Sequence, residues 1–226
     1  MNSTRSVAID GPSGAGKSTI ARAVSKMLGF IYVDTGALYR AIGLYALTCG
    51  ADTKNPAQVV PLLKRIDVSL RFVKDEQRVI LNGEDVSQRI RENAVSMAAS
   101  NVSAIPEVRA FLFDLQRSIA AANNVIMDGR DIGTVVLPNA DVKIFLTATP
   151  EDRAMRRCDE LAAKGQTIDY ETILKEIKER DYNDSHRDIA PLKKAGDAVV
   201  VDTTGYLLED SIAEISALIK SRLGIH

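Results

Sequence analysis

One glycine-rich stretch near the start of the chain constrains the fold more than any other feature. Residues 7–20 read VAIDGPSGAGKSTI: a short run typical of a buried strand, a glycine-rich turn, and the start of an amphipathic helix. The turn fits G-x-x-x-x-G-K-[ST] in the strand–turn–helix context that a phosphate-binding loop requires. Gly11, Gly14 and Gly16 allow backbone angles that point successive N–H groups into one concavity, where the helix dipole adds positive potential. The sequence therefore predicts a binding site for nucleotide phosphates.

The loop also assigns chemistry to individual residues. Lys17 can reach β- and γ-phosphate oxygens, and the Ser18 hydroxyl can ligate Mg²⁺. The residues predicted to bind the phosphate donor are Gly11, Pro12, Ser13, Gly14, Ala15, Gly16, Lys17, Ser18 and Thr19. A glycine-rich turn that matches by accident is the alternative, and the position between a strand and a helix argues against it.

Length and charge exclude several classes of function. The chain has 226 residues, enough for one domain with insertions and a substantial core. Its formal net charge of -1 gives no overall basic field that would attract a nucleic-acid polymer or an anionic membrane. Cys49 and Cys158 lack paired metal-site spacing, so we expect reduced thiols. With no apolar run of about 18 residues and no signal-peptide core before Asp10, we expect a cytoplasmic protein. We also expect a monomer.

Apolar runs alternate with amphipathic stretches along most of the chain. Strands are expected at 7–9, 30–33, 124–128, 142–146 and 198–201, where the runs are typical of strands buried on both faces. Helices are expected at 20–28, 37–49, from Pro56, 93–122 with a break at Pro106, 150–165, 170–184 and 208–223. This alternation predicts a mostly parallel α/β sheet with right-handed crossovers and helices on both faces.

Short motifs predict where one of these helices begins and where another ends. Thr149-Pro150-Glu151-Asp152 has the N-cap threonine, the proline and the carboxylate of a capping box. Gly29 suits the C-cap of the first helix. The buried face of that helix is expected to carry Ile20, Ala23, Val24, Met27 and Leu28.

Residues 67–85 change character. Val68, Leu70 and Phe72 alternate with polar residues, and Asn82-Gly83 is a hairpin-turn signal. Such alternation is typical of antiparallel strands with one solvated face, unlike the parallel segments on either side. We expect an inserted antiparallel β element here.

Three polar clusters outside the loop are candidates for ligand binding. The first is residues 128–131 (DGRD), which follow a strand at the sheet edge where open α/β sheets bind ligands; a polar turn with an internal salt bridge is the alternative. The second is Arg153, Arg156 and Arg157 on one short helix. These arginines suit phosphate binding, and a solvated helix face is the alternative. In the third, Arg180, Asp184 and Arg187 share a helix face, with surface pairing as the alternative.

Taken together, these segments resemble the bacterial cytidylate kinases, which transfer the γ-phosphoryl group of ATP to CMP or dCMP with Mg²⁺. The resemblance covers nearly the whole chain, including the β insert. Its most specific segments are Asp34-Thr35-Gly36 with Tyr39-Arg40, and DGRDIGT at 128–134. The other matching segments are Gly11–Ser18, IKERD at 177–181 and APL at 190–192.

The resemblance implies a role for each matching residue. Lys17, Arg130, Arg153 and Arg157 would be catalytic, with the last two on a lid. The residues that would bind CMP are Thr35, Tyr39, Arg40, Ser100, Arg109, Arg130, Asp131, Arg180, Asp184 and Arg187. Of these, Ser100, Arg109 and Asp131 would read the cytosine edge, although Asn101 and Ser103 leave open which side chain near Ser100 is used.

The resemblance also implies a division of the chain. Residues 1–34 and 123–226 would form the nucleoside-kinase core, with a short helical lid at about 150–168. Residues 35–122 would form the inserted domain that binds the nucleoside monophosphate. ATP, Mg²⁺, CMP and dCMP are the expected ligands.

Two other functions stay open on sequence alone. A kinase for another small acceptor would share the phosphate loop but not the three base-reading residues. An NTP-driven switch or RNA-associated NTPase usually has a basic surface or an effector domain, and the sequence shows neither.

Overall fold

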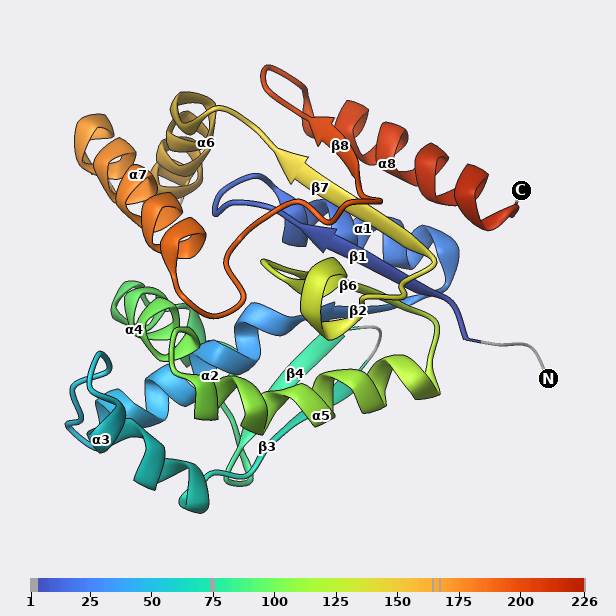
Figure 1. Cartoon of the computed structure of the whole chain (residues 1–226). Helices are drawn as coiled ribbons and strands as arrows, with labels where there is room; N and C mark the ends of the chain where they lie inside the picture. The colour runs from blue at the N-terminus through green and yellow to red at the C-terminus, as the bar shows by residue number, and fades with distance from the viewer. Residues whose placement is uncertain (1–3, 74–75, 164, 167, 226) are drawn as a thin grey trace.

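A computed structural model describes residues 4–73, 76–163, 165–166 and 168–225. Its central sheet has five parallel strands in the order β2-β6-β1-β7-β8 (Figure 1). The strands are β1 (Ser6–Asp10), β2 (Ile31–Asp34), β6 (Val125–Gly129), β7 (Val142–Thr147) and β8 (Val199–Asp202). All four neighbouring pairs are parallel, which confirms the predicted sheet.

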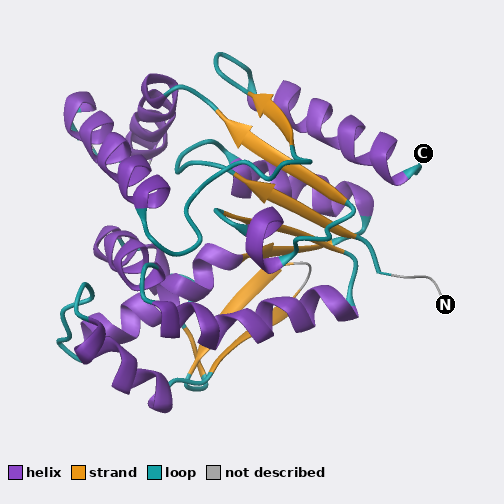
Figure 2. Cartoon of the chain, viewed as in Figure 1, coloured by secondary structure: helices purple, strands orange, loops and turns teal. Residues whose placement is uncertain are grey.

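Helices cover both faces of this sheet (Figure 2). On one face, α1 (Lys17–Leu28) and α8 (Leu208–Leu223) pack their buried aliphatic side chains against β1, β6 and β7. On the other face, the end of α5 (Pro106–Ala122) and a single π-helical turn, η3 (Ile132–Val136), cover Ala8 and Met127. Burial on both faces explains the nearly continuous apolar runs of these strands.

A second core lies beside the sheet and contains the inserted β element. Its helices are α2 (Thr35–Thr48), α3 (Pro56–Val59), η1 (Val60–Arg65), η2 (Arg89–Arg91) and α4 (Asn93–Ser103), with the start of α5. An antiparallel sheet, β3 (Val68–Val73), β4 (Glu76–Leu81) and β5 (Glu84–Asp85), packs against them. Asn82 and Gly83 both have positive φ, as the predicted turn requires.

Helices α6 (Pro150–Ala163) and α7 (Tyr170–His186) form a pair with a small core of their own around Leu161, Ile173 and Ile177. Figure 1 shows the pair beyond the arrowheads of the central strands, on the same side as α2 and α4. The carboxyl ends of the strands therefore face both the α6–α7 pair and the second core.

Two local predictions were wrong in part. Met27 is 60% exposed, whereas Ala21 and Ser25 are buried. Ala21 shares a core with the buried aliphatic side chains of α8. The Thr149 hydroxyl does accept from the Asp152 backbone N–H. The Asp152 carboxylate, however, pairs with Arg156 instead of closing the capping box.

Other local expectations are met. Gly29 caps α1 in the left-handed conformation, and both cysteines are free. Among the helices in the described ranges, none is long and apolar enough to span a membrane.

Candidate active site

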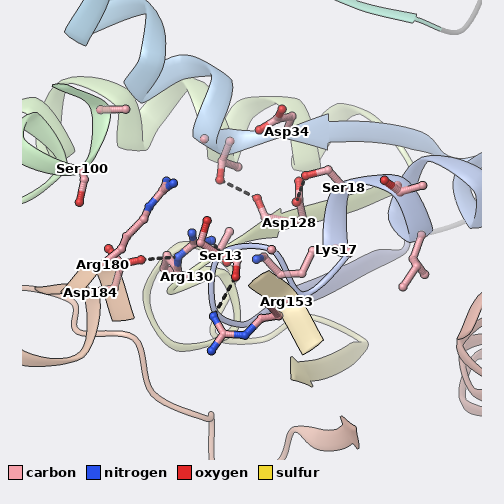
Figure 3. A pocket seen from close by; sticks show the side chains of 18 of the residues that line it. Ser13, Lys17, Ser18, Asp34, Ser100, Asp128, Arg130, Arg153, Arg180 and Asp184 are labelled. Atoms are coloured by element: carbon pink, nitrogen blue, oxygen red, sulfur yellow. Dashed lines mark hydrogen bonds and ion pairs between the residues drawn. The ribbon is translucent and has the colours of Figure 1, made fainter. Parts of the chain in front are cut away.

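A cavity of about 670 Å³ opens where the strands of the central sheet end (Figure 3). One side is the glycine-rich loop with the start of α1, and the other is built from α2, α4 and α5. Residues of α6 and α7 also line it. The size suits a small-molecule ligand of nucleotide dimensions.

Lys17 lies at the centre of the loop side. Its side chain is 5% exposed, and Nζ donates to the Pro12 carbonyl over 2.7 Å. Burial, with the neighbouring Arg130 as the next cause, lowers the pKa of Lys17 to about 7. A bound polyphosphate would favour the charged form of this amine.

Ser18 and Asp128 meet next to the loop. The Ser18 hydroxyl donates to Asp128 Oδ2 over 2.8 Å, and the Tyr32 hydroxyl donates to Oδ1 over 3.0 Å. Asp128 reaches this place because β6 lies beside β1, with Asp128 in register with Ile9. A hydroxyl and a carboxylate at this separation form an oxygen donor set that fits Mg²⁺, which keeps several water and phosphate ligands. The described residues contain no cluster of three or more His, Cys, Asp or Glu that could hold a metal ion.

The charged form of the Asp128 carboxylate lowers the stability of the ligand-free protein. Burial, followed by the charge of Asp34, raises its pKa to about 6. Because this exceeds the unfolded value of about 3.9, the folded state binds more protons between about pH 4 and pH 6. The contribution of Asp128 to the free energy of unfolding therefore falls as pH rises through this window.

We accordingly expect Asp128→Asn to raise the free energy of unfolding at pH 8 by on the order of 1–3 kcal/mol. At pH 5 the difference should largely disappear, because the wild-type carboxyl is then mostly protonated. Urea denaturation at both pH values measures the effect, with Asp114→Asn on the exposed face of α5 as the matched control. A variant less stable than wild type at pH 8 would contradict this account.

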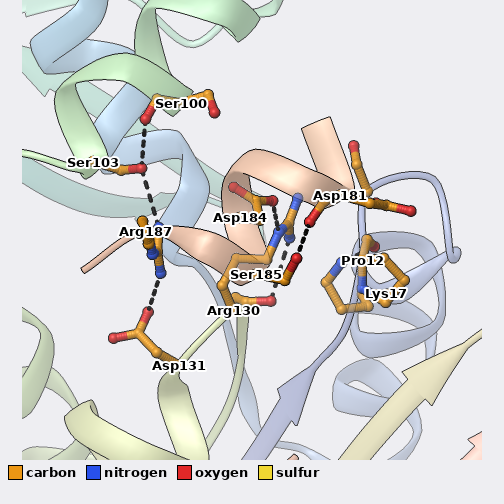
Figure 4. A network of polar contacts seen from close by, with 12 residues as sticks. Pro12, Lys17, Ser100, Ser103, Arg130, Asp131, Asp181, Asp184, Ser185 and Arg187 are labelled. Atoms are coloured by element: carbon orange, nitrogen blue, oxygen red, sulfur yellow. Dashed lines mark hydrogen bonds and ion pairs between the residues drawn. The ribbon is translucent and has the colours of Figure 1, made fainter. Parts of the chain in front are cut away.

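On the opposite side of the cavity, Asp131 is held between two arginines. Its carboxylate contacts Arg109 and lies 3.5 Å from Arg187, and all three side chains are buried. Figure 4 shows Asp131 facing Arg187. Burial raises the pKa of Asp131 although both arginines oppose the shift. Ser103 joins the cluster, because its hydroxyl accepts from Arg187 over 3.2 Å and donates to the Ser100 carbonyl over 2.8 Å.

A second ionic group lies between this cluster and the loop. Arg130 Nε donates to Asp184 over 2.7 Å. Burial alone would raise the pKa of Asp184, but the charges of Arg130, Arg180 and Arg187, with the hydrogen bond from Arg130, together outweigh it and keep that pKa below its ordinary value. Burial, with Arg130 as the next cause, lowers the pKa of Arg180 to about 10, and Arg180 Nε is buried with no hydrogen-bond partner among the described residues. Arg40 pairs with Asp34 over 2.8 Å. Such concentrated positive charge suits a phosphate anion.

Each arginine on α6 has a carboxylate partner. Arg153 is 2% exposed and bridges the Ser13 carbonyl (2.8 Å) and Asp181 of α7 (3.0 Å). Arg156 pairs with Asp152, and Arg157 with Glu160. Arg153 therefore ties the phosphate loop to α7 and is not part of a solvated helix face.

The cavity brings together every residue predicted to bind CMP and all four predicted catalytic residues. Of the predicted donor-binding residues it is lined by Ser13, Gly14, Gly16, Lys17, Ser18 and Thr19. Gly11, Pro12 and Ala15 are buried and are not among its lining residues, although the Pro12 carbonyl holds Lys17. Asn101 donates to Thr53. It is not part of the Asp131 cluster, which consists of Asp131, Arg109, Arg187 and Ser103.

Some lining residues were given no role by the sequence. Asp34 and Asp128, which are in register near the ends of β2 and β6, were named only within motifs, although their position at the end of β-runs was a usable signal. Tyr206 and Leu207 lie between β8 and α8, Leu208 is the first residue of α8, and all three line the cavity. Only their position after the last strand could have indicated a place in the site, because side chains of these types do not by themselves point to a catalytic or phosphate-binding role.

The fold and the site define a P-loop kinase of the nucleoside monophosphate kinase class. A family model described as cytidylate kinase matches residues 7–221. Proteins named "Cytidylate kinase" from Caldicellulosiruptor saccharolyticus and Clostridium tetani are 49% and 50% identical to the chain. The first match covers 96% of both chains, and the second covers 96% of this chain and 94% of the relative. The chain belongs to the cytidylate kinase family.

A solved structure agrees with this fold at a much lower identity. An uncharacterized protein from Eubacterium ventriosum is 12% identical, with a TM-score of 0.54 and coverage of 96% of this chain and 99% of that one. At this identity the similarity concerns the fold alone.

Proposed function

We propose that the chain transfers the γ-phosphoryl group of ATP to CMP and dCMP, yielding ADP with CDP or dCDP, in pyrimidine nucleotide metabolism. One observation carries the proposal: the phosphate loop and the arginine–carboxylate clusters line the same cavity, so donor and acceptor phosphates can meet there. Membership of the cytidylate kinase family supports it. The proposed substrates are intracellular metabolites, and we propose a cytoplasmic monomer that acts on no nucleic-acid polymer.

On the donor side, the loop N–H groups and Lys17 would hold the β- and γ-phosphates of ATP. Ser18 and Asp128 would hold Mg²⁺, which when bound supplies positive charge on the phosphate oxygens. Tyr206, Leu207 and Leu208 present an apolar wall that suits the flat base of the donor.

On the acceptor side, Arg40, Arg130, Arg180 and Arg187 would hold the phosphate of CMP. An oxygen of that phosphate attacks the γ-phosphorus in line, while the bond to the bridging oxygen of ADP breaks. Arg153 and Arg157 would add positive charge to the transferring group. No covalent intermediate with the protein is needed, since positioning and charge stabilisation carry this reaction.

Base recognition is assigned to the Asp131 cluster. Asp131 would accept from the exocyclic amine of cytosine, and Arg109 would donate to its ring nitrogen and carbonyl. Ser100 would complete this set, with the Ser103 hydroxyl holding Arg187 in place. Thr35 and Tyr39 would line the nucleoside pocket; Tyr39 lies under Arg109, with the guanidinium carbon 5.7 Å from the ring centroid.

A panel of acceptors tests the proposal. With ATP and Mg²⁺, the protein should phosphorylate CMP and dCMP with far higher kcat/KM than UMP, AMP or GMP. A better substrate among the other acceptors would move the chain to a different small-molecule kinase activity. ATP hydrolysis without acceptor that RNA stimulates would instead favour an RNA-associated NTPase.

We also propose a division into moving parts: a core of residues 1–34 and 123–226, an acceptor domain of 35–122, and a lid at about 150–168. Residues 164 and 167 of this lid lie outside the described residues. Mutual repulsion does not drive this motion, because Arg153, Arg156 and Arg157 are each paired with a carboxylate. Lid closure would therefore exchange these carboxylates for nucleotide phosphates.

Amide hydrogen exchange should report this closure. We expect exchange in α6 and α7 to slow when ATP and CMP analogues bind together, and to slow less with either analogue alone. Peptides from residues 215–223 of α8 serve as the internal control. Equal protection with and without both ligands would identify α6 and α7 as a static helix pair.

A further inference from the structure

Asp131 occupies an unusual position for a residue whose carboxylate faces the cavity. It is the N-cap residue of η3, and an aspartate at that place ordinarily accepts from the backbone N–H groups of the first turn. Among the described residues, Asp131 makes no such bond; its carboxylate contacts Arg109 and, as Figure 4 shows, Arg187 instead. The first N–H groups of η3 therefore need another acceptor.

Asp10 supplies it from the neighbouring strand. Asp10 is 4% exposed at the end of β1, where it is in register with Gly129 of β6. Its Oδ1 accepts from the Ile132 N–H and its Oδ2 from the Gly133 N–H, each over 2.7 Å. Both carboxylate oxygens are thus used on the two residues that directly follow Asp131.

The fit around this contact is close. A Cβ atom at Gly133 would lie 3.3 Å from Asp10 Oδ2 and 3.2 Å from the Lys143 side chain. Glycine at this position lets the backbone approach the carboxylate. Asp10 itself is not among the residues that line the cavity, so direct contact with substrate is not its role.

We propose that Asp10 is a positioning residue for acceptor-base selection, a role that rests on the proposed function. By capping η3 from β1, Asp10 leaves the Asp131 carboxylate available to the cavity. Without this cap, the acceptor closest in sequence to the freed N–H groups is the carboxylate of Asp131 itself. Turning Asp131 toward them would withdraw it from Arg109, Arg187 and the base.

Asp10→Asn tests this with little change in shape. Its amide group replaces one acceptor oxygen by a donor, so one buried N–H loses its partner. We expect the KM for CMP to rise and the CMP/UMP ratio of kcat/KM to fall by about tenfold, the factor for one lost buried hydrogen bond. The KM for ATP should stay within about twofold, because the loop contacts are unchanged.

A double-mutant cycle separates positioning from general damage. In an Asp131→Ala background, Asp10→Asn should leave the CMP/UMP ratio unchanged, because the residue through which it acts is gone. Lys143→Met is the matched control: Lys143 packs against the other side of Gly133 and binds the Pro138 carbonyl and Asp197, so the CMP/UMP ratio should not change. If Asp10→Asn does not fold, Gly133→Ala perturbs the same contact and should lower the ratio in the same direction.

The outcomes separate this proposal from the proposed function. If the wild-type protein does not prefer CMP to UMP, both fail. If it does, but Asp10→Asn (or Gly133→Ala in its place) lowers kcat/KM for both acceptors equally, Asp10 is a structural residue only. An equal fall of the ratio in the wild-type and Asp131→Ala backgrounds would likewise overturn the positioning role.

Discussion

Replacing Lys17 with methionine is expected to lower kcat for phosphoryl transfer to CMP by about a hundredfold or more while the fold is retained. The Lys17 side chain is buried beneath the loop, and its pKa of about 7 shows that the folded protein disfavours its charge. Methionine can occupy the place of the apolar stem, so the variant should fold. The charge that it removes is needed when the γ-phosphoryl group carries its greatest negative charge.

No neighbouring cation can readily take the place of this amine. Arg130 is held by Asp184, with its Nε 2.7 Å from the carboxylate. Arg153 is held by Asp181 and by the Ser13 carbonyl. To replace the Lys17 amine, either arginine would have to leave both its carboxylate and its own proposed place on the phosphates, and breaking a buried pair without a new partner is strongly destabilising.

Steady-state kinetics with saturating ATP and CMP measure the effect, and thermal unfolding verifies the fold. Lys26→Met, on the exposed face of the same helix, is the matched control and should retain wild-type kcat. Retention by Lys17→Met of more than about a tenth of the wild-type kcat would contradict the assignment, because groups that stabilise transition-state charge are typically worth about 10²-fold.

The parts of the site that sequence predicted are those in which local pattern and chemistry coincide. The loop from Gly11 to Ser18 needs only a strand before it and a helix after it. The parallel sheet then brings Asp34 and Asp128 to one edge, because parallel strands that end together place their following residues together. The sheet edge therefore made a ligand site near residues 128–131 predictable, whereas the individual acceptor-binding residues were assigned only through the resemblance to the cytidylate kinases.

Partner choice was less predictable, because it depends on register and helix rotation. A solvated helix face was the alternative for the three arginines on α6, yet Asp181 on α7 pairs with Arg153 from another helix. The bond from Ser18 to Asp128 likewise depends on β6 lying directly beside β1. Burial of Met27 was wrongly predicted because an amphipathic pattern does not say how far a neighbouring helix extends around it.

The second large effect is expected at Asp131, where Asp131→Ala should reduce kcat/KM for CMP by about a hundredfold and change it little for UMP. Cytosine carries an amine donor at C4 and an acceptor ring nitrogen, whereas uracil carries a carbonyl and an N–H at these places. A carboxylate accepts from the amine but opposes the carbonyl, and Arg109 cannot accept the uracil N–H. Each mismatch leaves buried polar groups unpaired, at about 1–3 kcal/mol, so two give discrimination on the order of 10²–10⁴.

The structure also contains the competing explanation for such a loss. Asp131 is paired with Arg109 and Arg187, so alanine leaves two buried guanidinium groups without this carboxylate. The variant should therefore also lose stability, because removing one partner of a buried pair is destabilising. Activity toward CMP alone could not separate lost folding from lost recognition.

The ratio of kcat/KM for CMP to that for UMP does separate them. Both acceptors are measured on the same preparation, so the fraction of folded enzyme cancels from the ratio. Asp131→Asn adds a matched variant with nearly the same shape. Its amide can donate to the uracil carbonyl, so this variant should also lower the CMP/UMP ratio of kcat/KM, by raising kcat/KM for UMP. A CMP/UMP ratio that stays at the wild-type value in both variants would remove Asp131 from base recognition and leave it as the structural partner of Arg109 and Arg187.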